Sequence, residues 1–246
     1  MISRRDSGCG ATHPLESATG LAMNLLALET STDRLSIAVS AHGRLFESAD
    51  VVGQRHAELA LDAIDALLAS AGLDPSELDG IAFGAGPGSF TGLRIATGIA
   101  QGLALGLGVP VVGVSTLDAL AEPCASWRVF ACIDARMGEV YCAALERSPS
   151  GWRAEAAPGV FAPERVPVPA GQGWVGRGTG FAAHGEQLAA RLGGAIARVE
   201  QDAVPTAGAV LRLAEPRLAA GEGADPAVAV PVYVRDKVAL KTSERR

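Results

Sequence analysis

The chain has 246 residues, a net charge of −6, 48% hydrophobic and only 4% aromatic residues. Because phosphate backbones are bound by clustered Lys and Arg, an acidic chain argues against a broad nucleic-acid-binding face. One basic stretch remains, the tail VRDKVALKTSERR, for which a solvated terminus is the default interpretation. The length suits two modest domains or one large α/β domain, with a core of small aliphatic side chains.

The N-terminal residues 1–22 are polar and contain no apolar run after Arg4 and Arg5, so they are not a signal peptide. We expect a disordered extension, or a start site upstream of a natural beginning at Met23. None of the four cysteines is in a C-x-x-C pair, which gives no support to a zinc site. Cys132 and Cys142 are candidates to face each other, reduced, across a hairpin.

The first half of the chain predicts three strands followed by alternating helices and strands. The expected strands are residues 25–28, 35–40, 44–52, a buried strand that begins at Gly80 and leads into the turn at 84–92, and 109–114. The expected helices are 55–70, a short turn at 75–77, a long helix after Ser89 and another after Ser115. Gly72 suits a helix C-cap, and Asp74 suits an N-cap with Glu77 completing a capping box. This order, βββαβαβα, is typical of a ribonuclease-H-like unit.

The second half repeats the opening pattern of the first in outline. A buried strand at 129–133 ends in Asp134 and leads to a strand at 140–144, so that Glu29 corresponds to Asp134. A Pro-rich loop at 158–169, a strand with a glycine turn at 175–180, a helix at 182–192, a strand at 195–199 and a helix at 207–220 follow. The sequence therefore predicts an α/β fold with two tandem ribonuclease-H-like lobes, residues 23–125 and 126–246, the architecture of the actin-like ATPase superfamily.

The long helix after Ser89 carries an unusual number of small residues. Residues 95–117 are uncharged and long enough to span a bilayer, but Pro110 and Gln101 interrupt them and favour a helix followed by a buried strand. Two small ridges run along the helix, one formed by Gly92, Ala96, Ala100 and Ala104 and the other by Gly98, Gly102 and Gly106. Each interior glycine costs about 1 kcal/mol relative to alanine, so we expect close backbone packing against the same chain or a partner.

Phosphate-binding and metal-binding motifs are incomplete. The turn at 84–92 lacks Gly-Lys-Ser/Thr and misses G-x-G-x-x-G spacing, so a structural role for it is favoured. In actin-like ATPases the two hairpins present acids and hydroxyls to phosphate and metal. The candidate nucleotide-facing residues here are Glu29, Thr30, Asp134, Arg136, Gly176 and Gly178. The first hairpin has no glycine and the second only Gly138, which disfavours autonomous ATP hydrolysis.

The four histidines form no H-E-x-x-H or related spacing. His56 opens the helix at 55–70, where a metal-binding pair would need a second His one turn later, and residue 60 is alanine. We therefore predict no metal site, a solvent-facing or interface role for His56, and no catalytic residues, since no nucleophile–base arrangement can be argued from spacing.

Four blocks of the sequence resemble one family. LALETSTDRLSIAVS, GAGPGSFTGLR, IDARMGEVY and PVYVRD are similar to the bacterial TsaB (YeaZ) family, from about residue 23 to the C-terminus. The resemblance implies a cytoplasmic, non-catalytic scaffold and dimerisation subunit of the complex that transfers a threonylcarbamoyl group to the adenosine beside the anticodon of tRNAs. It implies no membrane and no cofactor of its own, with ATP and metal on partner subunits.

The implied partners are the catalytic subunit TsaD, the ATPase TsaE, a second copy of the chain when it is alone, and tRNA through the complex. The hypothesised partner interface comprises His56, Leu59, Gly92, Ala96, Gly98, Ala100, Gly102, Ala104 and Gly106. The residues leave open which helix ridge is external and whether the basic tail touches tRNA. The rival hypothesis is an autonomous ATP-dependent kinase or ATPase on the same fold.

Overall fold

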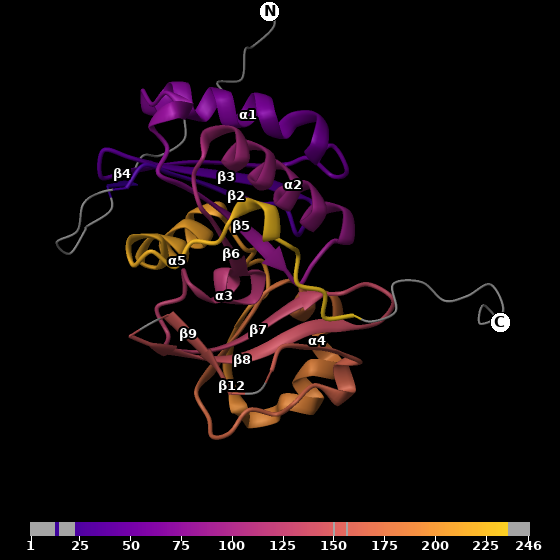
Figure 1. Ribbon diagram of the computed structural model, residues 1–246. Coiled ribbons are helices and arrows are strands. Elements are labelled where there is room, and N and C mark those ends of the chain that lie inside the picture. Colours follow the sequence, from indigo (N-terminus) through magenta and orange to yellow (C-terminus); the bar gives the residue numbers. More distant parts are fainter. Residues whose placement is uncertain (1–12, 15–22, 150, 156, 236–246) are drawn as a thin grey trace, which may run out of the picture.

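The computed structural model describes residues 13–14, 23–149, 151–155 and 157–235. Two mixed sheets lie one above the other, with helices on their outer faces and between them (Figure 1). The predicted two-lobed α/β architecture is confirmed. Of residues 1–22, expected to be a disordered extension, only His13 and Pro14 are described, and Cys9 and residues 236–246 of the basic tail lie outside the described part.

The first sheet has the strand order β1-β4-β3-β2-β5-β6. Its strands are β1 (His13–Pro14), β2 (Leu25–Glu29), β3 (Arg34–Ala41), β4 (Arg44–Val51), β5 (Gly80–Gly86) and β6 (Val111–Ser115). Strands β2, β3 and β4 are antiparallel, while β2, β5 and β6 run parallel to one another. Apart from the two-residue β1, this is the predicted series of three hairpin strands followed by crossover strands.

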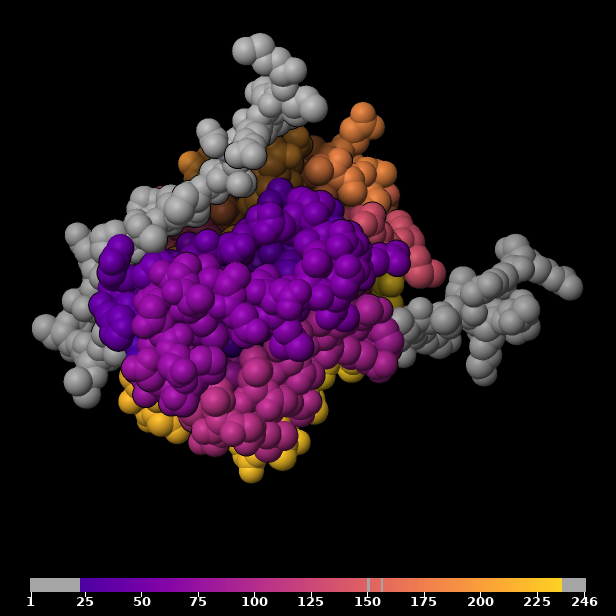
Figure 2. Space-filling model, turned by 90° about the horizontal axis from the view of Figure 1, so that it is seen from above, coloured from indigo at the N-terminus to yellow at the C-terminus, as the bar shows by residue number. Residues whose placement is uncertain are grey.

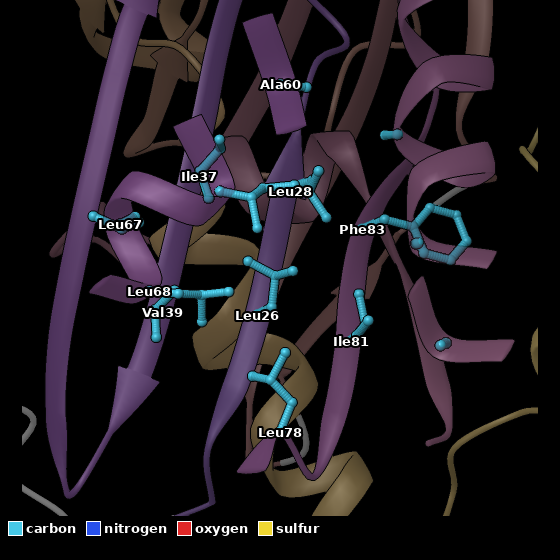
Figure 3. Packing of buried hydrophobic residues seen from close by; sticks show 14 of the residues in the cluster. Leu26, Leu28, Ile37, Val39, Ala60, Leu67, Leu68, Leu78, Ile81 and Phe83 are labelled. Atoms are coloured by element: carbon cyan, nitrogen blue, oxygen red, sulfur yellow. The ribbon is translucent and has the colours of Figure 1, made fainter. Parts of the chain in front are cut away.

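Alternation along the strands divides the core of the first lobe into two faces. Leu26, Leu28 and Phe83 pack under the outer helices α1 (His56–Ala71) and α2 (Phe90–Leu107), as Figure 3 shows for residues of β2, β3, β5 and α1. The neighbouring residues of the same strands point to the opposite face, toward the second lobe. Each strand therefore contributes to both core clusters.

Capping residues fix the helix boundaries as predicted. Gly72 ends α1 in the left-handed conformation, and Asp74 forms a capping box with Glu77 around the short helix η1 (Pro75–Glu77). Ser89 accepts the N–H of Gly92 at 3.3 Å at the start of α2. Among the described residues, no helix combines the length and apolarity that crossing a membrane requires.

The second sheet repeats the strand order of the first. Its strands are β7 (Arg128–Asp134), β8 (Val140–Ser148), β9 (Gly151–Ala154), β10 (Gly159–Phe161), β11 (Trp174–Arg177) and β12 (Ile196–Glu200). The order β10-β8-β7-β11-β12 matches β4-β3-β2-β5-β6, with β9 added beside β8, and α4 (Thr179–Leu192) holds the place of α2. The internal repeat is therefore present in space, and the facing cysteines Cys132 and Cys142 are opposed, free and buried.

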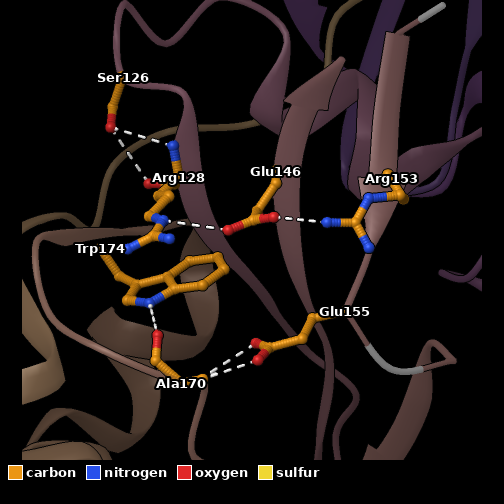
Figure 4. Close-up of polar contacts among 7 residues, drawn as sticks. All are labelled: Ser126, Arg128, Glu146, Arg153, Glu155, Ala170 and Trp174. Atoms are coloured by element: carbon orange, nitrogen blue, oxygen red, sulfur yellow. Dashed lines mark hydrogen bonds and ion pairs between the residues drawn. The ribbon is translucent and has the colours of Figure 1, made fainter.

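Polar contacts attach the Pro-rich loop to the second sheet. The loop contains β10 and the short helix η2 (Pro163–Arg165), neither of which was predicted. At its end the Ala170 N–H donates to the Glu155 carboxylate at 3.1 Å, and the Trp174 indole donates to the Ala170 carbonyl at 2.9 Å (Figure 4). The loop is thus held in place by backbone groups that periodicity does not reveal.

The helices α3 (Thr116–Ala121) and α5 (Ala207–Ala219) lie between the two sheets (Figure 1). Helix α5 packs its buried face on the first sheet, against Leu25 and Ala27. The structure therefore differs from the predicted boundary, which gave all of residues 126–246 to the second lobe. Periodicity shows that a helix has an apolar face, but it does not show which sheet that face covers.

After α5 the chain continues along the first lobe. The short helix η4 (Pro226–Val228) lies beside α2, where the Gln101 amide donates to the carbonyl oxygens of Pro226 and Ala229 at 3.1 and 2.9 Å. Further on, the Val232 N–H donates to the Ala85 carbonyl at 2.7 Å. The last described residues, 230–235, then reach the second lobe through Arg235, which pairs with Glu139.

Candidate functional site

A cleft of about 910 Å³ lies where the two lobes meet. Its walls come from the β2–β3 turn, the loop before α2, the β7–β8 turn, the start of α4 and residues 232–235. The polar lining includes Ser31, Asp33, Thr91, Asp134, Arg136 and Arg235. The sequence predicted nucleotide-facing residues in the same two hairpins that border this cleft. The position of each of those residues can therefore be compared with the cleft.

Two of the predicted nucleotide-facing residues line the cleft, and they pair with each other. Asp134 accepts the Arg136 N–H at 2.9 Å, and its second oxygen lies 3.2 Å from the Arg136 guanidinium. His184 Nε2 is 3.7 Å from the same carboxylate, and the Asp134 N–H donates to Thr179 Oγ1 at 3.2 Å. The carboxylate of the second hairpin is therefore contacted by Arg136 and His184 of its own lobe.

The acid of the first hairpin points away from the cleft. Glu29 is 2% exposed, and one carboxylate oxygen accepts the Ser31 N–H at 2.6 Å while the other lies against Gly84 without a hydrogen-bond partner. Burial raises the pKa of Glu29, and hydrogen bonds from Ser31 oppose that shift. Thr30 is also buried, with its hydroxyl donating to the Gly92 carbonyl at 2.8 Å. The prediction that Glu29 and Thr30 face a nucleotide is wrong for this geometry.

The two glycines after β11 serve packing inside the second lobe. Gly176 lies against the ring of Phe181, and a Cβ there would overlap it. Gly178 lies against the carbonyl of Cys132 and the side chain of Leu120, and it has a φ of 116°. Both are buried, which corrects their assignment as nucleotide-facing residues. Glycine is required at both positions because strand and helix approach each other closely. From sequence spacing alone, the same glycines are equally compatible with a phosphate loop.

The two small ridges of α2 lie on different faces of the helix. Ala96, Ala100 and Ala104 are fully buried on the first sheet, and Gly92 is buried against the backbone of Thr30. By contrast, Gly98, Gly102 and Gly106 are exposed, and a Cβ on any of them would meet nothing within 4 Å. Gly92 and the alanine ridge were predicted to lie at a partner interface, but they are buried within the chain, so that prediction is wrong for them. The glycine ridge therefore lies on the outward face of α2. Figure 2 shows the surfaces of α1 and α2 beside each other, in purple to magenta.

The prediction that His56 faces solvent or a partner is also wrong. It is 4% exposed, and its Nε2 lies 3.1 Å from the Arg34 carbonyl oxygen, so it ties the start of α1 to β3. Leu59 is half-buried against the first core. The outer face instead exposes two leucines that the prediction omitted, Leu61 at 53% and Leu105 at 59%. The spacing of these leucines from the buried residues of each helix places them on its exposed side, and this could have been predicted from the sequence.

The described residues contain no cluster of three or more His, Cys, Asp or Glu side chains that could hold a metal ion. The hairpin acids do not fit the phosphate-and-metal arrangement expected of an actin-like ATPase, since Glu29 lies inside its lobe and Asp134 is paired with Arg136. Two repeated lobes with a cleft between them nevertheless define a protein of the actin-like ATPase fold.

Comparisons with known proteins narrow this class. Residues 50–241 match a family model described as TsaD, tRNA N6-adenosine threonylcarbamoyltransferase. The tRNA threonylcarbamoyladenosine biosynthesis protein TsaB of Escherichia coli is 36% identical over 89% of this chain and 97% of its own length. The Haemophilus influenzae TsaB is 35% identical over 89% of this chain and 96% of its own length. YeaZ from Pseudomonas aeruginosa has 40% identity and a TM-score of 0.79, with 86% of this chain and 99% of that chain covered. The chain belongs to the TsaB (YeaZ) family.

Proposed function

We propose that this chain is the non-catalytic scaffold and dimerisation subunit of the complex that transfers a threonylcarbamoyl group to the adenosine beside the anticodon of tRNAs. The observation that carries the proposal is the exposed ridge of Gly98, Gly102 and Gly106. Interior glycines destabilise a helix by about 1 kcal/mol each relative to alanine, and no group of the described chain occupies the space they leave. A partner backbone that packs there would restore that stability.

The outer helices α1 and α2 provide the rest of the docking surface. Leu61 and Leu105 are exposed on these helices, and apolar side chains around a small-residue ridge are the composition of a close helix–helix contact. The expected occupant is the transferase subunit TsaD, with a second copy of this chain in its place when the chain is alone. The ATPase TsaE joins the assembly, ATP and metal belong to these partner subunits, and tRNA is reached through the complex in the cytoplasm.

The cleft supports a role without independent chemistry. The two hairpin acids that the sequence predicted to face phosphate are engaged within the chain, because Glu29 is buried in the first lobe and Asp134 pairs with Arg136. An autonomous kinase or ATPase would need such groups free to face phosphate. A titration of the isolated chain with ATP tests this directly, since micromolar binding accompanied by turnover would contradict the proposal.

The substitution Gly102→Leu tests the docking surface. The side chain enters open space, so we expect a folded chain that no longer binds the transferase subunit and no longer supports threonylcarbamoyl transfer in a reconstituted assay. Gly185→Leu is the control, because Gly185 is an exposed glycine of α4, just after the kink at His184, with equally open surroundings. Unchanged binding by Gly102→Leu, or equal loss in both variants, would argue against the proposal.

A further inference from the structure

Arg94 is held in a fixed position at one end of the glycine ridge. It lies four residues before Gly98, so Arg94, Gly98, Gly102 and Gly106 form one outward row of α2. Its guanidinium carbon is 3.8 Å from the centroid of the Phe90 ring, and its Nε donates to the Tyr233 hydroxyl at 2.9 Å. The side chain is therefore oriented by two aromatic residues rather than free to sample many rotamers.

The terminal nitrogens of Arg94 are not used within the described chain. Arg94 forms no ion pair there and no hydrogen bond besides the one from Nε. The two arginines that line the cleft differ in this respect, since Arg136 pairs with Asp134 and Arg235 pairs with Glu139. An oriented guanidinium with two unpaired Nη groups matches the two oxygens of a carboxylate, and forming that pair costs little further side-chain ordering.

We propose that Arg94 binds a carboxylate side chain of the transferase subunit and thereby fixes the register of the partner helix on the glycine ridge. This inference rests on the proposed function. The row from Arg94 to Gly106 is about 18 Å long, which corresponds to slightly more than three helical turns of a partner.

A protein carboxylate fits this surface better than an RNA phosphate. Phosphate backbones are held by several cations acting together, and the outward row of α2 carries Arg94 as its single charge, continuing into three glycines. Phe90 and Tyr233 flank it at 37% and 46% exposure, and Leu105 is exposed farther along the helix. An arginine beside exposed aromatic residues and an apolar face is the composition of a protein–protein hot spot.

Binding of the purified transferase subunit to four forms of the full chain tests the inference: wild type, Arg94→Gln, Arg94→Lys and Tyr233→Phe. We expect Arg94→Gln to weaken binding about 10- to 100-fold, the range for loss of a charged hydrogen-bonded pair. Arg94→Lys, which keeps the charge but not the fork, should lie between Arg94→Gln and wild type. It also replaces Arg94→Gln as the test variant if that chain does not fold. Tyr233→Phe removes only the hydroxyl that orients Arg94, so a loss below about threefold is expected.

Other outcomes overturn the inference. Unchanged binding by Arg94→Gln does so, and so do equal losses in Arg94→Gln and Tyr233→Phe, because Arg94 would then act by holding residues 230–235. If Gly102→Leu abolishes binding while Arg94→Gln does not, the proposed function stands and the carboxylate contact falls. If the wild type does not bind the transferase subunit, both fall. Reduced tRNA binding by Arg94→Gln with unchanged protein affinity would identify a phosphate instead and overturn the carboxylate.

Discussion

Thr30 and Gly92 are joined by two contacts that bring their backbones together. The Thr30 hydroxyl donates to the Gly92 carbonyl at 2.8 Å, and the Thr30 carbonyl oxygen lies in the space that a Cβ on residue 92 would need. One residue further, the Ser89 N–H donates to the Ser31 carbonyl at 2.8 Å. The glycine-rich turn before α2 is thus built around the first hairpin of its own chain, not around a ligand phosphate.

Gly92→Ala is expected to destabilise the isolated chain by about 3 kcal/mol. The added methyl group would overlap the Thr30 carbonyl, and a backbone atom in a strand-connecting turn yields less readily than a flexible side chain. Urea unfolding measures the change in free energy. A loss within experimental error would mean that the two backbones do not approach as closely as described.

Gly98→Ala is the matched comparison within the same helix. Its Cβ would meet nothing within 4 Å, so the substitution should stabilise the isolated chain by about 1 kcal/mol through helix propensity alone. Opposite signs for the two alanine substitutions, measured in one unfolding series, would establish that the ridges have different surroundings. Equal destabilisation would contradict the assignment of Gly98 to the outer face.

Local signals predicted the elements well, whereas the choice between equivalent faces required tertiary contacts. Ser89, Asp74 and Gly72 mark helix ends through bonds within a few residues of each, so their roles follow from sequence. The alanine and glycine ridges of α2 both have the i, i+4 spacing of a single helix face. Which ridge is buried depends on distant residues, because the alanines pack on the first sheet and Gly92 meets Thr30, about 60 residues earlier.

Strand alternation contained one unused signal for the cleft. Glu29 has the same parity as Leu25 and Ala27, which are buried in the core cluster under α5, so the period of two already predicts a buried carboxylate. The analogy between the two hairpins obscured this. The second-hairpin residue Asp134 is only part-buried and lines the cleft, although the pattern aligns it with Glu29.

His56→Ala should lower the free energy of unfolding by about 1–3 kcal/mol and leave the affinity for the transferase subunit unchanged. The buried imidazole contacts the Arg34 carbonyl, and its removal leaves that oxygen without the ring nitrogen. Leu61→Ala, on the exposed side of the same helix, should show the reverse pattern of weaker binding at unchanged stability. Parallel unfolding and binding measurements on both variants separate the two roles. If His56→Ala folds but binds the transferase subunit more weakly, His56 contributes to the interface as first predicted.

Arg235→Gln should increase hydrogen exchange at the Val232 amide about tenfold or more. Residues 230–235 are tied to the first lobe through the Val232 bond to Ala85 and to the second lobe through the Arg235 pair with Glu139. Loss of the second tie lets the segment open more often, and exchange reports such local opening. Arg165→Gln is the control, because Arg165 is an exposed arginine of η2 whose side chain forms no ion pair with the described residues. Equal exchange in both variants would show that the Glu139 pair does not restrain the segment.

Asp118→Asn should stabilise the chain at neutral pH and have little effect near pH 4. Burial raises the pKa of Asp118 from 3.8 to about 6, the nearby Glu122 charge adds to the shift, and the Ser115 hydroxyl opposes it. Between these values the folded state binds a proton that the unfolded state has released. Wild-type stability therefore falls as the pH rises from about 4 to 6 and then levels off.

Asparagine carries no charge at any of these pH values, so the advantage of Asp118→Asn should grow over that interval to at most about 3 kcal/mol. Urea unfolding of both chains at pH 4.5 and pH 7.5 measures the difference. Asp62→Asn on the exposed face of α1 serves as the control, because its surroundings are open to solvent and its effect should be small at both pH values. A pH-independent difference for Asp118→Asn would mean that the carboxylate ionises normally, and that the contact between α3 and the sheets leaves it accessible to water.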